Sequence, residues 1–261
     1  MTKTKLVGIL NVTPNSFSDG GLFLEPEAAL KQARKLFADG AAIVDIGAEA
    51  TNPWAEPLTP AEEWARLEPI LPILVKEFPG KLSVDTYHWQ TAQKALQLGD
   101  VWINDVMTFR DPEMIKVAAK YKATCVVSHA PLVSRSVKEV HTQKIDKIMQ
   151  ISDELDEQVQ KLLKAGVSKS KIIVDPGIGF GKTMRLNWQL LAYAKHTDWP
   201  AMLGHSRKRF LANDPKTGKE VPGKDKLSSA LNLEAAQLAI NAGADYLRVH
   251  DIELYTQLFH Q

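Results

Sequence analysis

The chain has 261 residues, 44% of them hydrophobic, and its 32 basic and 31 acidic residues give a formal net charge of +1. A chain of this length can form one domain, so a single domain over residues 1–261 fits better than two. The small net charge gives no reason to expect nucleic acid or a membrane surface as a partner. The five-residue apolar run Leu6–Leu10 is too short for a signal peptide, and no run reaches the roughly 18 apolar residues of a membrane span. The single cysteine, Cys125, excludes an intramolecular disulfide. We therefore expect a cytoplasmic protein.

Short apolar runs alternate with helical patterns along the whole chain. Eight runs each lead to a polar residue: LVGIL to Asn11, AIVDIG around Asp45, LSV to Asp85, VWI to Asn104, ATCVVS to His129, KIIV to Asp175, AMLG to Ser206–Lys208, and ADYL to Arg248 and His250. Helical periodicity predicts helices at Pro26–Asp39, Pro60–Glu77, Trp89–Leu98, Pro112–Tyr121, Thr142–Ala165, Met184–Lys195, Leu227–Ala242 and Glu253–Phe259. This order predicts a single-domain (β/α)8 TIM barrel, whose active site would lie where the strands end.

Three connections are longer than is usual after a strand, and all three should rise on that face. They are residues 11–25, 47–59 and 209–226. Long loops in compact domains often carry function, so we expect substrate contacts there rather than surface decoration alone.

The segment IIVDPGIGFGKT, residues 172–183, contains glycines and a lysine but matches neither phosphate-binding motif. Six places before Lys182 stands Pro176 instead of glycine, and the glycines fall at 177, 179 and 181. The pattern instead predicts a strand that ends at Asp175 and a tightly turned glycine loop after it.

Three strand-terminal residues, Asp85, Asn104 and Asp175, would form a cup of hydrogen-bond acceptors if they converge. Such a cup suits a heterocycle with several N–H donors, because a carboxylate can accept two N–H bonds side by side. The alternative is that each residue caps the helix that follows it.

Cationic residues follow the last two strands: Arg207, Lys208 and Arg209, then Arg248 and His250. Barrels often bind phosphate at this position, and Arg248 offers a planar fork for phosphate oxygens. Asn11, on the neighbouring first strand, could contact the same anion or a Mg²⁺ ion bound with it. The alternative is a set of surface salt bridges to residues such as Asp251. The histidines show no zinc-binding spacing.

Six motifs in order along the chain resemble dihydropteroate synthase. They are NVTPNSFSDGG (Asn11–Gly21), SVDTY (Ser83–Tyr87), IND (Ile103–Asp105), VDPGIGFGK (Val174–Lys182), GHSRK (Gly204–Lys208) and RVHD (Arg248–Asp251). The resemblance implies condensation of 6-hydroxymethyl-7,8-dihydropterin diphosphate with p-aminobenzoate, with release of diphosphate. It also implies a pterin site at Asp85, Asn104, Asp175, Phe180 and Lys208. Diphosphate and Mg²⁺ would be held by Asn11, Arg248 and His250, with Asn11 as the metal ligand. The catalytic residues implied are Asp19, Lys208, Arg248 and His250, Thr51 would contact substrate, and a homodimer is expected.

The sequence departs from that family mainly in the loops. Asn15 stands where the family has an aspartate, Asn52 and Trp54 alter the second loop, which lacks the family's arginine, and Arg209 stands where serine is common. The last two changes fall where the family holds the aminobenzoate. Two alternatives therefore remain: a related enzyme that condenses the pterin diphosphate with a different arylamine, and a pterin-binding domain of the methyltetrahydrofolate methyltransferase type. The second would not need the diphosphate residues that this chain carries.

Overall fold

The computed structural model describes residues 4–12, 25–49, 57–131, 137–140 and 143–259. Eight parallel strands in the order β6-β5-β4-β3-β2-β1-β8-β7 form the sheet. The strands are β1 (Lys5–Asn11), β2 (Ile43–Gly47), β3 (Leu82–Asp85), β4 (Val101–Asp105), β5 (Thr124–Ser128), β6 (Ile172–Asp175), β7 (Met202–Leu203) and β8 (Tyr246–Val249). A bridge between Val174 and Ala201 joins β6 to β7, so the sheet is a nearly closed barrel.

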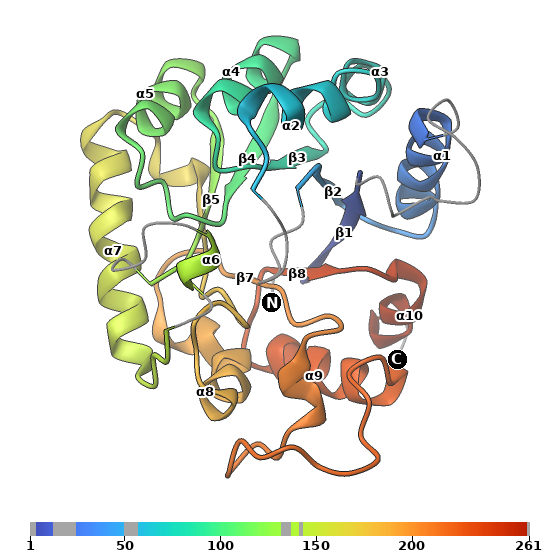
Figure 1. Ribbon diagram of the computed structural model, residues 1–261, viewed down its shortest axis with the longest axis vertical. Helices are drawn as coiled ribbons and strands as arrows, with labels where there is room; N and C mark the ends of the chain where they lie inside the picture. Colours follow the sequence, from blue (N-terminus) through green and yellow to red (C-terminus); the bar gives the residue numbers. More distant parts are fainter. Residues whose placement is uncertain (1–3, 13–24, 50–56, 132–136, 141–142, 260–261) are drawn as a thin grey trace.

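Helices surround the strands, with α2 to α5 along one side, α7 on the next, and α8, α9, α10 and α1 around the remainder (Figure 1). The α-helices are α1 (Glu25–Ala38), α2 (Pro60–Leu67), α3 (Leu71–Glu77), α4 (Trp89–Leu98), α5 (Pro112–Tyr121), α6 (Val137–Val140), α7 (Ile148–Lys164), α8 (Met184–Gln189), α9 (Ser229–Asn241) and α10 (Ile252–Thr256). The 3₁₀ helices are η1 (Lys169–Lys171), η2 (Leu190–His196), η3 (Arg209–Ala212) and η4 (Gln257–Phe259). The predicted TIM barrel is confirmed.

Four predicted helices differ from the structure, among them the one expected over Glu253–Phe259, which is α-helical only to Thr256 and continues as η4. The helix expected over Pro60–Glu77 is divided into α2 and α3, because Pro72 cannot donate to the preceding turn and disfavours a continuous helix. The helix expected from Thr142 begins at Ile148, since the backbone at Ile145 instead pairs with Lys182. The helix expected over Met184–Lys195 is α-helical only to Gln189 and continues as η2.

Two apolar layers hold the barrel together. Buried residues of the helices pack against the outer face of the strands in one large cluster. Inside the barrel a smaller cluster contains Val7, Ile43, Val126, Ile173 and Met202, with Trp102 and Tyr246 packed against it. The two aromatic rings meet edge to face with centroids 5.4 Å apart. This apolar plug fills the amino-terminal half of the barrel, so any cavity must lie above it, toward the strand ends.

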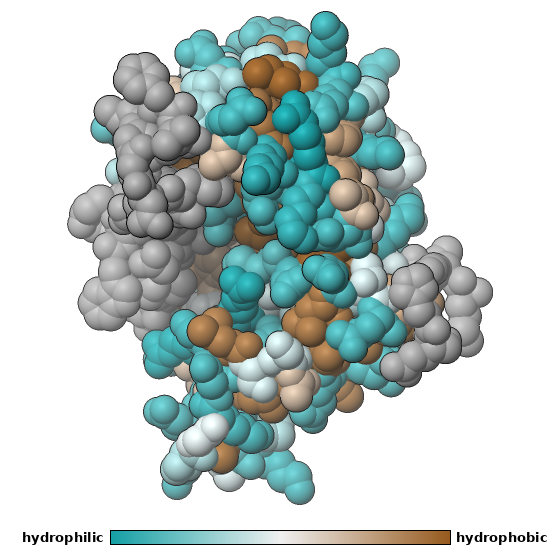
Figure 2. All heavy atoms as spheres, turned by 90° about the vertical axis from the view of Figure 1, so that its right-hand side faces the viewer, coloured by the Kyte–Doolittle hydropathy of each residue, from teal (hydrophilic) through white to brown (hydrophobic). Residues whose placement is uncertain are grey.

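The outer surface is mainly hydrophilic on the face that carries α1 and α10, where hydrophobic side chains form small separate groups (Figure 2). In the described part of the chain, no helix combines the length and the apolar character that crossing a membrane requires. Cys125 is buried in β5, as expected for a residue of an apolar run.

Candidate active site

The polar residues of the barrel interior lie one layer above the apolar plug. Each follows an inward-facing apolar residue by two positions: Asp45 follows Ile43, Asn104 follows Trp102, Ser128 follows Val126, Asp175 follows Ile173 and Arg248 follows Tyr246. Side chains alternate between the two faces of a strand, so this spacing directs all of them into the barrel. The register of the parallel strands places Asp85 beside Asn104 and Ser128 beside Asp175.

All of these residues except Asp45 line a cavity of about 90 Å³ at the carboxyl ends of the strands. Six of the predicted site residues line it: Asp85, Asn104, Asp175, Phe180, Lys208 and Arg248. The structure therefore brings together the acceptor cup and the lysine that the sequence placed on four different strand ends.

Arg248 joins two carboxylates on the floor of this cavity. Its Nε atom donates to Asp45 Oδ2 at 2.5 Å and its Nη2 atom donates to Asp85 Oδ2 at 2.6 Å. Asp45 is 1% exposed, so the guanidinium supplies the countercharge that such a buried carboxylate needs. Arg248 thus lies with the cup, and its contact with diphosphate stays a prediction.

Asn104 is oriented by its neighbours on β2 and β5. Its Nδ2 atom donates to Asp45 Oδ2 at 3.0 Å, while its Oδ1 atom accepts from Ser128 Oγ at 2.9 Å. These two bonds fix which side of the amide is the donor and which is the acceptor. A ligand in the cavity therefore meets an amide of defined orientation.

Asp175 and Lys208 form the opposite wall. Asp175 Oδ1 accepts the Gly177 amide at 2.7 Å, and the Lys208 Nζ atom donates to the Ile178 carbonyl and lies 5.2 Å from the centre of the Phe180 ring. Gly177 has a φ of +66°, and an added Cβ would lie 2.0 Å from the His129 carbonyl oxygen. The glycine loop predicted after Asp175 thus needs glycine at this position in order to fold under the cavity.

Burial perturbs the ionisation of the cup. Burial raises the pKa of Asp85 to about 7, although the charge of Arg248 acts to lower it. Burial also raises the pKa of Asp175, although the charge of Lys208 acts to lower it. It lowers the pKa of Lys208 to about 8, although Asp175 favours the ammonium form. Groups with shifted pKa values that share one cavity are typical of functional sites.

The capping alternative for the acceptor residues is wrong. His88 occupies the N-cap position of α4, Asp111 that of α5 and Thr183 that of α8. The surface salt-bridge alternative also fails for Arg248, whose partners are buried, whereas Asp251 caps α10.

Other predicted residues lie at the rim or outside the described part of the chain. His250 Nδ1 is 3.1 Å from Ser206 Oγ, and burial together with Arg207 and Arg248 lowers the pKa of His250 to about 3. At neutral pH this imidazole is uncharged, so it can act on an anion as a hydrogen-bond donor rather than as a cation. Arg209 is exposed at the start of η3. Asp19, Thr51, Asn15, Asn52 and Trp54 lie outside the described residues.

Asn11 ends β1 with an exposed side chain. Among the described residues, no three His, Cys, Asp or Glu side chains are grouped so that they could hold a metal ion. Mg²⁺ commonly takes only one or two protein oxygens and completes its shell with substrate phosphates and water. A lone amide oxygen at the barrel mouth fits such a substrate-bridged ion, though not a cage made of protein ligands alone.

Two residues of the site, Asp45 and His129, have no role that the sequence predicts. The role of Asp45 is to pair with Arg248, which lies 203 positions away in the sequence, and no local pattern predicts that contact. His129 lines the cavity, where its carbonyl oxygen and Nδ1 lie 2.9 and 2.8 Å from the Nζ atom of buried Lys182, while its Nε2 lies 3.1 Å from Glu154 on α7. The position of Asp45 at a strand end was a usable signal, but no sequence signal links Lys182 to His129.

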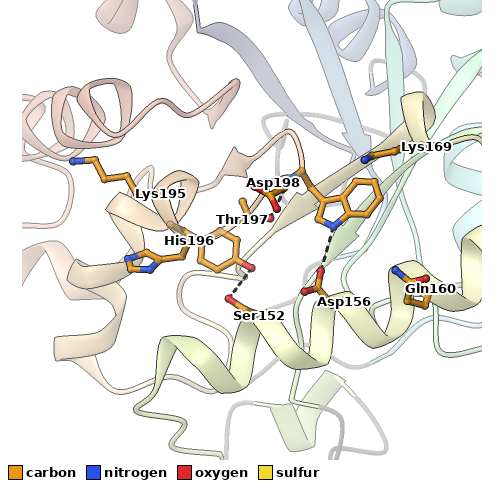
Figure 3. A pocket seen from close by; sticks show the side chains of 10 residues that line it. Ser152, Asp156, Gln160, Lys169, Lys195, His196, Thr197 and Asp198 are labelled. Carbon is orange, nitrogen blue, oxygen red and sulfur yellow. Dashed lines mark hydrogen bonds between the residues drawn. The ribbon is translucent and has the colours of Figure 1, made fainter.

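A larger hollow, of about 440 Å³, lies between α7 and η2 (Figure 3). Its lining includes Lys169 and Trp199, which precede β6 and β7, so it opens near the amino ends of the strands. Two pairs of its polar groups are hydrogen-bonded to each other: Trp199 Nε1 donates to Asp156 at 3.2 Å, and Ser152 Oγ donates to the Tyr193 hydroxyl at 3.4 Å. The convergent, electrostatically perturbed groups are in the smaller cavity, which we therefore take as the candidate active site.

Known proteins resemble the chain over almost its entire length. The model of a family described as pterin binding enzymes matches residues 7–250. The dihydropteroate synthase of Synechocystis sp. is 37% identical over 262 aligned residues, which cover 98% of this chain and 88% of the relative.

Solved structures show the same architecture. The Xanthomonas albilineans dihydropteroate synthase with 4-aminobenzoic acid superposes with a TM-score of 0.84 and 33% identity, covering 99% of this chain and 91% of that one. The Anaplasma phagocytophilum enzyme of the same name, with bound 6-hydroxymethylpterin-monophosphate, gives a TM-score of 0.79 and 37% identity, covering 98% and 96%.

Proposed function

The chain belongs to the family of pterin-binding enzymes, and we propose that it is a transferase of folate biosynthesis that makes dihydropteroate. The reaction joins 6-hydroxymethyl-7,8-dihydropterin diphosphate to p-aminobenzoate and releases diphosphate. The observation that carries this proposal is the cup of Asp85, Asn104 and Asp175, closed on one side by Lys208, in a family whose relatives are named dihydropteroate synthases.

The cup suits a pterin because its acceptors and donors are arranged around a small, flat space. Asp175 is a carboxylate that can accept N–H groups of the amino-pyrimidine edge, and the oriented amide of Asn104 offers both an acceptor and a donor. Lys208 can donate to a ring carbonyl or nitrogen, and the Phe180 ring beside it supplies an apolar wall.

The chemical step needs no protein nucleophile. The C–O bond to diphosphate breaks, the amine nitrogen forms the new C–N bond, and the amine loses one proton, which the released diphosphate can accept. Positive charge develops on the pterin methylene as the anion departs, and the buried carboxylates of the cup stabilise that charge in a region of low dielectric constant. At the barrel mouth the neutral His250 donates a hydrogen bond to the departing anion.

We propose Mg²⁺ as the cofactor, with Asn11 supplying the protein oxygen and diphosphate the others. When bound, the ion would offset the negative charge of the leaving group. Asn11→Ala should then raise the Mg²⁺ concentration required for half-maximal activity, whereas removal of an exposed residue elsewhere should not.

Arg209, exposed at the start of η3, and the altered residues Asn52 and Trp54 favour a second candidate in which another arylamine replaces p-aminobenzoate. The methyltransferase alternative has no support among the relatives compared above, which are named synthases.

The test is release of diphosphate by the purified protein with Mg²⁺, pterin diphosphate and a panel of arylamines. We expect turnover with p-aminobenzoate, and loss of pterin binding in Asp175→Asn. The matched control is Asp156→Asn, which removes a carboxylate from the hollow of Figure 3 and should leave activity unchanged. Turnover with other arylamines alone would select the second candidate, and tight pterin binding without any turnover would overturn both.

We also propose a homodimer that works in the cytoplasm. Leu227 and Leu238, before and within α9, are 57% and 47% exposed, and apolar side chains of this kind are typical of contact surfaces between subunits. An unpaired buried cysteine suits a reducing compartment. Light scattering should give a mass twice the 29.0 kDa of the chain, and Leu238→Glu should halve it.

A further inference from the structure

The turn after β4 holds two consecutive residues other than glycine in the left-handed region. Thr108 has a φ of +68° and Phe109 a φ of +51°. Among the described residues, Lys122 and Arg207 also combine a side chain with a positive φ, but each stands alone. Lys122 ends α5, where a left-handed residue is a frequent way to terminate a helix. The left-handed region is especially unfavourable for a β-branched residue such as Thr108, so the surroundings must hold this turn in place.

Asp105, at the end of β4, holds the main chain of the turn. Its Oδ1 atom accepts from the Met107 amide at 2.7 Å, and its Oδ2 atom accepts from the Phe109 amide at 2.9 Å. The Asp105 carbonyl oxygen also accepts from the Thr108 amide at 3.1 Å. Asp105 is 1% exposed, and Thr108 and Phe109 are both 0% exposed. Both oxygens of a buried carboxylate therefore keep the turn in its strained conformation.

The Thr108 side chain joins this turn to the end of β5. Its Oγ1 atom donates to the Ser128 carbonyl oxygen at 2.9 Å and accepts from the Ala130 amide at 2.9 Å. The paired register of β4 and β5 ends at Asp105 and Val127. The hydroxyl of Thr108 thus continues the connection between the two chains beyond the sheet.

This connection reaches the cavity through Ser128. Ser128 Oγ donates to Asn104 Oδ1 at 2.9 Å, and Asn104, Val106 and Ser128 all line the cavity. The bond from Ser128 is one of the two that determine which side of the Asn104 amide is the acceptor. A displacement of Ser128 away from β4 would weaken that control. Thr108 is not among the lining residues, so it acts on a ligand only through its neighbours.

A buried hydroxyl bonded to a main-chain carbonyl can also serve stability alone. Thr4 is such a case: it is 8% exposed, and its Oγ1 atom donates to the Ala244 carbonyl at 2.7 Å, near the amino ends of β1 and β8. Thr108 differs from Thr4 in two respects. Its backbone is strained, and strain of this kind clusters at functional sites. It also contacts a residue that orients a side chain of the cavity.

We propose that Thr108 is a positioning residue for the pterin: its hydroxyl holds Ser128 against β4, and Ser128 in turn orients the Asn104 amide toward the ligand. This inference rests on the proposed function, in which Asn104 belongs to the pterin cup. Thr108 then contributes to pterin affinity without touching the pterin. Its effect falls on the pterin and not on the arylamine.

The test compares Thr108→Val, which keeps the branched shape and loses the hydroxyl, with Thr108→Ser, which keeps the hydroxyl. Calorimetry measures the binding of pterin diphosphate with Mg²⁺ and without arylamine. Thr108→Val should weaken binding about tenfold, because the Ser128 carbonyl and the Ala130 amide lose this partner, whereas Thr108→Ser should stay within about twofold of wild type. In turnover, Thr108→Val should raise the KM for pterin diphosphate by a larger factor than it lowers kcat, and the KM for the arylamine should not change.

Two comparisons separate positioning from stability. The matched control is Thr4→Val, which removes a buried hydroxyl far from the cavity; it should lower the melting temperature and leave pterin affinity unchanged. In a double-mutant cycle, Thr108→Val should weaken binding much less in the Ser128→Ala background than in wild type, because both residues act on one amide. Equal losses of affinity in Thr4→Val and Thr108→Val, or additive losses in the cycle, would overturn the inference.

A further measurement needs no ligand. Hydrogen exchange of the Ala130 amide, followed by NMR, should be faster in Thr108→Val than in wild type and slow again in Thr108→Ser. Unchanged exchange in Thr108→Val would overturn the inference, as would a pterin affinity equal to that of wild type. If wild type binds no pterin, the proposed function fails instead, and the exchange result alone decides whether Thr108 holds the end of β5 against β4.

Discussion

Removing Asp45 tests whether the floor of the cup is also a structural element. Asp45 is 1% exposed and accepts two hydrogen bonds, from the Arg248 Nε atom at 2.5 Å and from Asn104 Nδ2 at 3.0 Å. The bond to a charged donor contributes about 1.5–3 kcal/mol and the amide bond about 1 kcal/mol. Asp85 still pairs with Arg248, so the charge is not left wholly uncompensated. We therefore expect Asp45→Ala to lower the free energy of unfolding by about 3 kcal/mol, in the lower part of the range for broken buried ion pairs.

Urea unfolding followed by tryptophan fluorescence measures this change, with the midpoint and the slope fitted together. The matched control is Asp100→Ala, since Asp100 is 65% exposed and lies 3.9 Å from Lys171. Exposed pairs of this kind contribute little, so the control should unfold as wild type does. A loss below about 1 kcal/mol in Asp45→Ala would mean that the buried pair does not stabilise the barrel, and the argument from burial would be wrong.

Three further outcomes follow from single features of the site. Gly177→Ala should abolish pterin binding in calorimetry, because its Cβ would lie 2.0 Å from the His129 carbonyl oxygen. The control is Gly166→Ala, whose added Cβ has no atom within 4 Å. This variant should bind pterin normally, with a slightly lower melting temperature because the φ of Gly166 is +98°. Pterin affinity should fall as the pH rises through about 8, where Lys208 loses its proton, and Lys208→Arg should remove that dependence; a flat wild-type profile would contradict the lowered pKa. Cys125, buried and with its pKa raised to about 12 by burial, should react with a thiol reagent only after unfolding, so labelling of the native protein would contradict its placement.

The strands and the cup were predictable from local patterns. Apolar runs that end on polar residues identified all eight strands, and the spacing of two between Ile173 and Asp175, or between Tyr246 and Arg248, already determines which side chains share a face. Because parallel strands end at one edge of the barrel, residues distant in sequence could be grouped before any coordinates were considered.

The pairing of charges was not predictable in the same way. Whether Arg248 faces a ligand anion or a protein carboxylate depends on the distance between β8 and β2, the two neighbours of β1, and no local pattern contains that distance. The break between α2 and α3 had a local signal in Pro72, which the apolar periodicity outweighed. For Lys182 the sequence suggested only phosphate binding, and that motif does not match. In the structure Lys182 is 4% exposed and its Nζ atom contacts His129.

The charge balance of the cup has a consequence for the proposed reaction. With all groups ionised, the carboxylates of Asp45, Asp85 and Asp175 exceed the cations Arg248 and Lys208 by one negative charge. Burial is the largest cause of the raised pKa values of Asp85 and Asp175, and the charges of Arg248 and Lys208 oppose it. A pocket with this balance disfavours an anion at its floor and favours a ligand that becomes more positive. In the proposed reaction the diphosphate would lie toward the rim, where Asn11 and His250 are. Its departure would leave positive charge on the methylene, near the buried carboxylates. The residues proposed to bind the pterin would thereby stabilise the transition state more strongly than the ground state.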